Sequence, residues 1–247
     1  NNKKIKILHI VNGLSPGGAE IMLLNLVSHA DRSRFDISVI CLQKKGEISI
    51  DIERLGISIF HLNILKKYDF FLKFLKLIFI LIKIKPDIIH TWMYHSNLIG
   101  GIAAKLATSS KIMWSIHSTT LDPGPEKKST EIAIRLSSFF SKHLPDKIVL
   151  CSKASFQFHK IIGFEKNKMM VIPNGIDLGK FKYLSKAKLN LMSELKLAHD
   201  TKFIGMVGRY HSMKRHDIFL HAAQIIVSKY PSIHFILCGS QVDNSNE

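Results

Sequence analysis

Acidic residues are scarce in this sequence, and the shortage limits the classes of partner that the protein can have. Only 19 of its 247 residues are Asp or Glu, against 35 Lys or Arg, so the formal net charge is +16 at pH 7. A surplus of this size suits a polyanion, which could be nucleic acid, an anionic membrane surface or a nucleotide diphosphate. The apolar content of 46% argues against a disordered chain and is ample for a packed core.

Cysteine is scarce as well. Cys41, Cys151 and Cys238 each lie in or beside an apolar run, and no C-x-x-C spacing occurs. We interpret them as reduced core residues of a cytoplasmic protein rather than as disulfides. The opening stretch Asn1–Lys4 leads into an apolar run too short for a signal peptide. We therefore expect a cytoplasmic location, with peripheral binding at the inner face of the membrane left open.

Long uninterrupted apolar runs are also missing. The most apolar segment, residues 68–84, is broken by Lys73, Lys76 and Lys83. Its longest clean run, Leu77–Ile82, falls far short of the about 20 residues that a membrane span needs. Two interpretations stay open. The segment is either a surface helix of an α/β domain whose lysines snorkel, or a helix that rests on an anionic membrane.

What the sequence does contain is an alternation of short β-rich runs with helical patterns along nearly the whole chain. The predicted strands are 5–11, 36–42, 57–62, 87–91, 111–116, 146–151, 168–172, 203–208 and 233–238. The predicted helices lie around 19–29, 69–84, 96–107, 129–142, 153–162, 186–197 and 214–229. Such alternation is typical of α/β proteins in which a parallel sheet carries helices on both faces.

A change of composition after the seventh strand predicts a domain boundary. The pattern breaks at Pro173-Asn174-Gly175, a polar segment follows, and a fresh βαβ unit begins at Lys202. We expect two Rossmann-like domains, residues 1–184 and residues 185–247. The second is too short to be complete, because three elements cannot cover both faces of a sheet.

Several nucleotide- and metal-binding motifs are absent, namely G-x-G-x-x-G, the Walker loop and H-E-x-x-H. Instead, Gly17 and Gly18 stand between a predicted strand and a predicted helix. Glycine allows close approach, and a helix start offers free N–H groups to an anion, so a bound phosphate or sugar is one interpretation. A tight strand–helix connection without a ligand is the other.

Histidines lie at the ends of two consecutive predicted strands. His117 follows strand 111–116, and His90 and His95 lie near the end of the strand before it. Open α/β sheets bind ligands at the carboxyl edge of their strands, so His117 is a candidate ligand contact that His90 and His95 could join. Their spacing does not suit a metal site.

Two cations flank the start of the last predicted helix. Arg209 and Lys214 come directly after strand 203–208. A guanidinium fork binds phosphate oxygens and an ammonium neutralises their charge, so this pair predicts a diphosphate clamp. An ordinary pair of solvated surface charges is the alternative.

In order and spacing, these pieces resemble the retaining glycosyltransferases of the GT-B fold, specifically family 4 (glycosyl transferases group 1). The matching stretches are the GGAE opening, Lys85–Thr91, Ser115–Ser118, Val149–Lys153, Val171–Asp177 and VGRYHSMKRHD. Each stretch is weak alone, and the resemblance extends over essentially the whole chain.

The resemblance implies two Rossmann-like domains, the first binding an acceptor and the second most of a nucleotide-sugar donor. Gly17 and Gly18 would line the cleft beside the donor phosphates or the acceptor. His117 would contact the donor sugar near its reacting carbon. Arg209 and Lys214 would stabilise the departing diphosphate, which removes the need for a metal or other cofactor. Further acceptor-side or cleft-lining candidates are His90, His95 and Asn174.

One family motif is missing. The carboxylate pair Glu-x7-Glu, which handles the donor sugar and ribose in the family, does not occur, because no glutamate has another eight positions later. We therefore expect a complete acceptor-side domain joined to the first βαβ part of a donor-side domain. Such a chain would be inactive or weak by itself, and a second chain supplying the rest is one alternative.

The function expected from this resemblance is transfer of a sugar from a nucleotide-diphosphate sugar to a glycan or lipid-linked acceptor in cell-surface polysaccharide biosynthesis. A non-catalytic basic module that binds a membrane surface or a protein partner is the alternative. Nucleic-acid binding rests on charge alone and is not expected, since no recognition motif supports it.

Overall fold

The computed structural model describes residues 3–64, 69–119, 128–198 and 200–243. The chain divides into two compact units, residues 1–175 (unit 1) and residues 176–247 (unit 2). The sequence places this boundary slightly further along, between residues 184 and 185. Every residue from 172 to 190 is exposed, so burial does not mark a boundary within that stretch.

Unit 1 is built on a parallel seven-stranded sheet with the order β3-β2-β1-β4-β5-β6-β7. Its strands are β1 (Ile5–Val11), β2 (Phe35–Cys41), β3 (Ser58–His61), β4 (Ile88–Trp92), β5 (Lys111–Ile116), β6 (Lys147–Leu150) and β7 (Met169–Val171). All seven strands predicted for this part of the chain are confirmed, and with them the α/β fold class. The strand order reverses between β1 and β4, which is where open parallel sheets bind their ligands.

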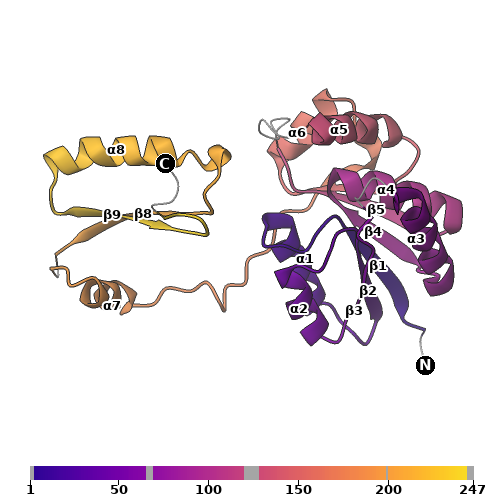
Figure 1. Ribbon diagram of the computed structural model, residues 1–247, viewed down its shortest axis with the longest axis horizontal. Helices are drawn as coiled ribbons and strands as arrows, with labels where there is room; N and C mark the ends of the chain where they lie inside the picture. Colours follow the sequence, from indigo (N-terminus) through magenta and orange to yellow (C-terminus); the bar gives the residue numbers. More distant parts are fainter. Residues whose placement is uncertain (1–2, 65–68, 120–127, 199, 244–247) are drawn as a thin grey trace. The chain divides into compact units, whose positions relative to one another are not determined.

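Helices cover both faces of this sheet (Figure 1). They are α1 (Gly18–Ser28), α2 (Glu47–Arg54), α3 (Phe70–Ile84), α4 (Met93–Ala107), α5 (Lys128–Phe140) and α6 (Lys153–Ile161). α1 packs beside α2 on one face, whereas α3, α4 and α5 form a layer on the other. Right-handed crossovers explain the division, because the chain moves outward from β1 to β3, returns through α3, and then moves outward the other way.

The central strands are buried on both faces, which explains their almost continuous apolar sequence. In β1, Leu8 and Ile10 belong to the core beneath α3, α4 and α5. Val11 belongs to the core beneath α1 and α2. A strand sandwiched in this way needs apolar side chains at nearly every position.

The sequence does not predict α2. Its residues Ile48-Ser49-Ile50-Asp51-Ile52 alternate apolar and polar, which is the pattern of a half-buried strand. In the structure Ile48 and Ile52 lie one helical turn apart and are both buried, while Ile50 is 45% exposed. The spacing of four residues, rather than the alternation, describes how this segment packs.

Unit 2 contains α7 (Ala187–Glu194), β8 (Lys202–Val207), α8 (His216–Lys229) and β9 (Ile233–Cys238). The two strands pair in parallel along their whole length, as the sequence predicts. α8 packs on β9, where the rings of Phe219 and Phe235 lie 5.7 Å apart. The two-stranded sheet of β8 and β9 is only partly buried, and Val207 at the end of β8 is 85% exposed.

Candidate functional site

The carboxyl ends of the central strands form the candidate site of unit 1. β1 pairs with β4 and β4 pairs with β5, so the segments that follow these strands emerge side by side at one edge of the sheet. They are the loop of residues 12–17, the start of α4 at Met93, and His117. The strand register therefore places His117 and Gly17 at the same edge.

His117 lies flat against Trp92. Their ring centroids are 5.2 Å apart and their planes differ by 9°. The backbone N–H of His117 donates to the sulfur of Met93 over 3.4 Å, so the residue is held through its backbone as well as through its ring. Nδ1 of His117 is buried but has no hydrogen-bond partner in the described part of the chain. An unpartnered buried polar atom costs about 1–3 kcal/mol, which a ligand bound at this atom would recover.

The protonation of His117 is set mainly by its burial, which lowers the pKa of the ring. A hydrogen bond with the side chain of Asn174 acts in the opposite direction. The ring is therefore neutral at pH 7, with one nitrogen as donor and the other as acceptor. The structure thus brings together two of the predicted site residues, because the exposed Asn174 follows β7 at the same edge.

Two more histidines lie beneath Trp92. His9 and His90 face each other across β1 and β4, with ring centroids 5.1 Å apart, and His90 lies 4.7 Å from Trp92. The indole N–H of Trp92 donates to Nδ1 of His9 over 3.2 Å. Nε2 of His90 lies at a hydrogen-bond distance of 2.8 Å from Oγ of Ser115. The rings of His9, His90 and Trp92 form a closely packed aromatic support under His117.

His90 is only 4% exposed and lies beneath Trp92, where it supports the site from below. Its expected role as an acceptor-side or cleft-lining residue stays a prediction. Sequence reasoning missed His9, because the signal that connects it to His90 is the pairing of β1 with β4, which requires the strand order. His95 is half-buried on the first turn of α4, at the same edge, and its role stays a prediction.

The two buried histidines predict a loss of stability in acid. Burial lowers the pKa of His9 to about 4 and holds the pKa of His90 well below its usual 6.5. Between these values the unfolded chain binds protons that the folded chain does not. The stabilisation is therefore complete above about pH 6.5 and disappears as the pH falls toward 4. At pH 5, His9 alone should cost about 2 kcal/mol of the free energy of unfolding.

Urea denaturation at pH 7 and pH 5 measures this loss. His9→Gln, which keeps an acceptor for the Trp92 indole, should show a smaller loss than the unmodified protein. The exposed His143 supplies the control, since His143→Gln should lose as much stability as the unmodified protein. Equal losses in the two variants would contradict the role assigned to His9.

Neither glycine of the GGAE stretch is required by its backbone conformation. Gly17 has a φ of −164°, which any residue adopts. A Cβ at Gly17 would collide with the carboxylate of Glu20, which folds back over the start of α1, whereas a Cβ at Gly18 would meet no atom within 4 Å. The group nearest to Gly17 is thus the chain's own carboxylate. An anion at this helix start would have to displace Glu20, and the phosphate role of Gly17 and Gly18 stays a prediction.

Gly46 is the glycine that the edge does require. A Cβ there would lie 2.5 Å from the carbonyl carbon of Leu14 and 2.7 Å from the backbone nitrogen of Ser15. The N–H of Ile48 also donates to the Leu14 carbonyl over 2.9 Å. Oγ of Ser49 accepts from the Gly46 N–H over 3.2 Å and completes the start of α2. The start of α2 thus supports the loop of residues 12–17.

Gly46→Ala is expected to destabilise the protein by about 1–3 kcal/mol, because the new methyl group meets backbone atoms that cannot rotate away. Urea denaturation measures the change. Gly18→Ala is the matched control and should shift stability by less than about 0.5 kcal/mol, since its Cβ enters open space. Equal effects of the two substitutions would contradict the close approach.

The predicted diphosphate clamp lies in unit 2, on the turn after β8. Gly239 fixes this turn, because a Cβ there would collide with the Gly208 carbonyl and lie 2.9 Å from the backbone nitrogen of Arg209. The methylene groups of Lys214 pass 3.7 Å from the Cβ position of Gly208. Arg209 and Lys214 are exposed, and neither forms an ion pair within the described ranges. Arg215, in contrast, pairs with Asp217 over 2.7 Å.

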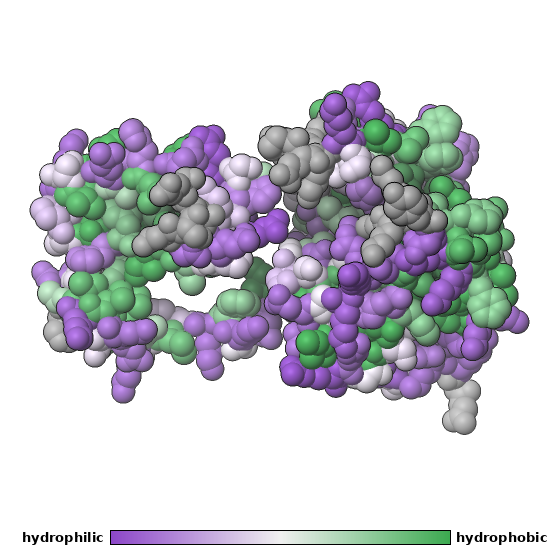
Figure 2. All heavy atoms as spheres, in the orientation of Figure 1, coloured by the Kyte–Doolittle hydropathy of each residue, from purple (hydrophilic) through white to green (hydrophobic). Residues whose placement is uncertain are grey.

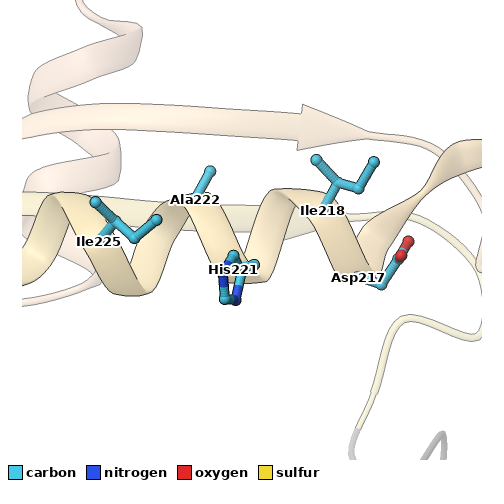
Figure 3. Close-up of a pocket in the computed structure, with 5 residues that line it drawn as sticks. All are labelled: Asp217, Ile218, His221, Ala222 and Ile225. Atoms are coloured by element: carbon cyan, nitrogen blue, oxygen red, sulfur yellow. The ribbon is translucent and has the colours of Figure 1, made fainter.

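A shallow hollow on α8 carries no comparable chemistry. Ile218, Ala222 and Ile225 point to one side of the helix, and Asp217 and His221 lie on the adjoining side (Figure 3). Its lining is mostly apolar and includes none of the predicted site residues. The described parts of the chain also contain no group of three His, Cys, Asp or Glu side chains that could hold a metal ion.

The family model of Glycosyltransferase Family 4 matches residues 16–180, which include Gly17 and Gly18, the stack of His117 on Trp92, and Asn174. The chain belongs to this family. The match ends before Arg209 and Lys214, so it covers most of the site of unit 1 and not the predicted clamp.

Individual relatives agree with this membership. The chain is 25% identical over 246 residues to the Escherichia coli UDP-Gal:alpha-D-GlcNAc-diphosphoundecaprenol alpha-1,3-galactosyltransferase, covering 96% of this chain and 62% of the relative. It is 32% identical over 109 residues to the Staphylococcus aureus capsular polysaccharide biosynthesis glycosyltransferase CapH, covering 44% of this chain and 28% of the relative.

Among solved structures, Anabaena HepE in complex with UDP-glucose has a TM-score of 0.77 at 20% identity, covering 98% of this chain and 63% of HepE. This likeness confirms the GT-B type of fold. The chain spans less than two thirds of the length of the galactosyltransferase and of HepE.

Proposed function

We propose that this chain carries the acceptor-side domain and the first part of the donor-side domain of a retaining glycosyltransferase. The enzyme would move a sugar from a nucleoside-diphosphate sugar to a glycan or lipid-linked acceptor in cell-surface polysaccharide biosynthesis. The observation that carries the proposal is the unpartnered Nδ1 of His117, held over an aromatic support at the ligand-binding edge of a family 4 sheet.

The names of the relatives support the two substrate classes. One relative is named for UDP-galactose and a diphosphoundecaprenol-linked acceptor, and another for capsular polysaccharide biosynthesis. The structure of HepE holds UDP-glucose. By analogy, we propose a nucleoside-diphosphate sugar as donor, a lipid-linked or glycan acceptor, and work at the inner face of the membrane.

The chemistry assigns separate roles to the two units. The bond between the anomeric carbon and the diphosphate breaks, and an acceptor hydroxyl forms the new bond to that carbon. The hydroxyl proton leaves to the departing diphosphate or to solvent. The neutral His117 would hydrogen-bond the donor sugar beside the reacting carbon. Arg209 and Lys214 would stabilise the charge that develops on the diphosphate, which requires no metal.

A transfer assay tests the proposal. The protein, purified at the length that its own cells make, is incubated with a panel of radiolabelled nucleoside-diphosphate sugars and the lipid extract of those cells. Protein-dependent labelling of lipid or glycan with one donor is the expected result. Absence of labelled product with every donor, from protein that is folded, would contradict transferase activity.

The alternative is a non-catalytic module that binds a membrane or a partner, and the net charge of +16 favours it. The same preparation discriminates between the two functions. A module would bind its surface while leaving every nucleotide sugar intact, whereas a transferase consumes one donor and releases its nucleoside diphosphate.

A further inference from the structure

α3 is apolar toward the core and also toward solvent. On its inward side, the α3 residues Leu77 and Leu81 are fully buried. On the outward side, five large apolar side chains are between 45% and 69% exposed, namely Phe71, Leu72, Leu75, Phe79 and Ile82. At about 100° per residue these five fall within an arc of about 100°. We call them the outer face of α3.

Lysines border one edge of this outer face. Lys76 and Lys83 project about 20–40° beyond Leu72 in the same helical projection. Both are exposed, and neither forms an ion pair within the described ranges. Lys73 differs from them, because it pairs with Asp69 and donates to the Asn63 carbonyl over 2.7 Å. The two bordering lysines are therefore available to an anionic partner.

α5, in the same helix layer, exposes a second group of apolar side chains. α3 contacts α4 and α4 contacts α5 in the same layer. On α5, Ile132, Leu136 and Phe139 are 58%, 44% and 67% exposed at a spacing of four and three residues, which places them on one side of the helix. Hydrophobic residues gather over the α3 side of unit 1 in the space-filling view (Figure 2). An apolar surface of this kind normally marks a contact with another molecule or a membrane.

Three features favour an anionic bilayer as the partner. Phe and Leu on one side with Lys at the border is the composition of helices that lie in the membrane interface. α3 has only 15 residues, and no helix of the described residues is long and apolar enough to cross a membrane. The net charge of +16 complements anionic lipid. A symmetric pairing with a second copy would instead bring together two chains that each carry a net charge of +16.

We propose that the outer face of α3, with the exposed side of α5, docks the protein on an anionic membrane surface. Phe71 and Phe79 enter the boundary between headgroups and acyl chains, and Lys76 and Lys83 contact lipid phosphates. Only the purpose of this docking rests on the proposed function, since docking would hold the site near a lipid-linked acceptor. It specifies a location for membrane contact that does not depend on catalysis.

Vesicle flotation tests the docking. The full chain is mixed with phosphatidylcholine vesicles, with or without about 30% phosphatidylglycerol. We expect binding to the anionic vesicles and little binding to the neutral ones. Phe71→Ser/Phe79→Ser should reduce binding at least tenfold, because two aromatic side chains no longer enter the bilayer. Lys76→Gln/Lys83→Gln should reduce it roughly tenfold at low salt and less at high salt.

The matched control lies on the opposite layer. Leu26→Ser/Ile50→Ser removes two large apolar side chains that are 47% and 45% exposed from α1 and α2 and should leave binding unchanged. All variants change exposed side chains, and equal urea midpoints establish that they fold. Unchanged binding of the α3 variant, or equal binding to neutral and anionic vesicles, would overturn the proposal. If light scattering showed a dimer that only the α3 substitutions abolish, the partner of this face would be a second copy, which would also overturn the proposal.

Vesicle flotation and the transfer assay can refute the docking and the proposed function independently of each other. Sugar transfer without vesicle binding would remove the docking face and leave the proposed function intact. Vesicle binding through α3 without transfer from any donor would remove the proposed function and leave the docking face intact.

Discussion

His117→Ala is expected to lower the rate of sugar transfer by about 10²–10³-fold, the size of effect seen when one preorganised polar contact to a transition state is removed. The same change should lower the free energy of unfolding by only about 1 kcal/mol, because it removes one half-buried ring from its stack on Trp92. The reason for the difference is the buried Nδ1, which lacks a partner within the described residues and is free to bond a donor sugar.

Transfer rates and urea midpoints of the purified variants measure the two effects. His117→Phe is the informative companion, because it keeps the aromatic stack and removes both nitrogens. It should be nearly as stable as the unmodified protein and as slow as His117→Ala. The exposed His143 again supplies a control that should change neither quantity. A His117→Phe enzyme with the unmodified rate would show that the ring is structural.

Arg209→Ala/Lys214→Ala is expected to weaken binding of a nucleoside diphosphate by about 10²-fold at low salt, since each cation makes a charge-assisted contact to phosphate. The loss should shrink as salt rises, because exposed charges are screened. Isothermal titration with UDP, GDP and ADP at two salt concentrations measures it. The turn that holds Arg209 depends on the close approach of Gly239, so the clamp requires a folded unit 2.

A control of equal charge separates the clamp from the general basicity of the protein. Lys202→Ala/Lys229→Ala removes two exposed lysines from the same unit and should change the affinity by less than about twofold, the effect of distant screened charges. If both double variants lose affinity equally, the nucleotide is attracted by net charge and the clamp does not exist.

Most of the fold is predictable from the sequence, because strands buried on both faces must be apolar and the helices between them follow a different period. The exceptions have physical reasons. α2 carries alternating isoleucines, and only its packing shows that Ile48 and Ile52 share the buried side. The predicted helix 214–229 begins at His216, because Arg215 adopts a left-handed conformation with a φ of 53°.

The candidate site is predictable from the sequence only through the rule that open parallel sheets bind ligands at the carboxyl ends of their strands. That rule identifies His117, which follows a strand at the carboxyl edge. It cannot identify the stack of Trp92 on His117 or the contact of Trp92 with His9, because these join different strands and only the sheet order brings them together. Gly46 was missed for the same reason, since the group it must avoid is the backbone of Leu14 on another loop.

A crystal structure of the protein with its nucleoside-diphosphate sugar tests whether His117 contacts the donor sugar. The protein should be the length that its own cells make. We expect a sugar oxygen to lie about 3 Å from Nδ1 of His117 and to supply the hydrogen-bond partner that this nitrogen lacks. A donor bound elsewhere, with Nδ1 of His117 still unpartnered, would contradict it.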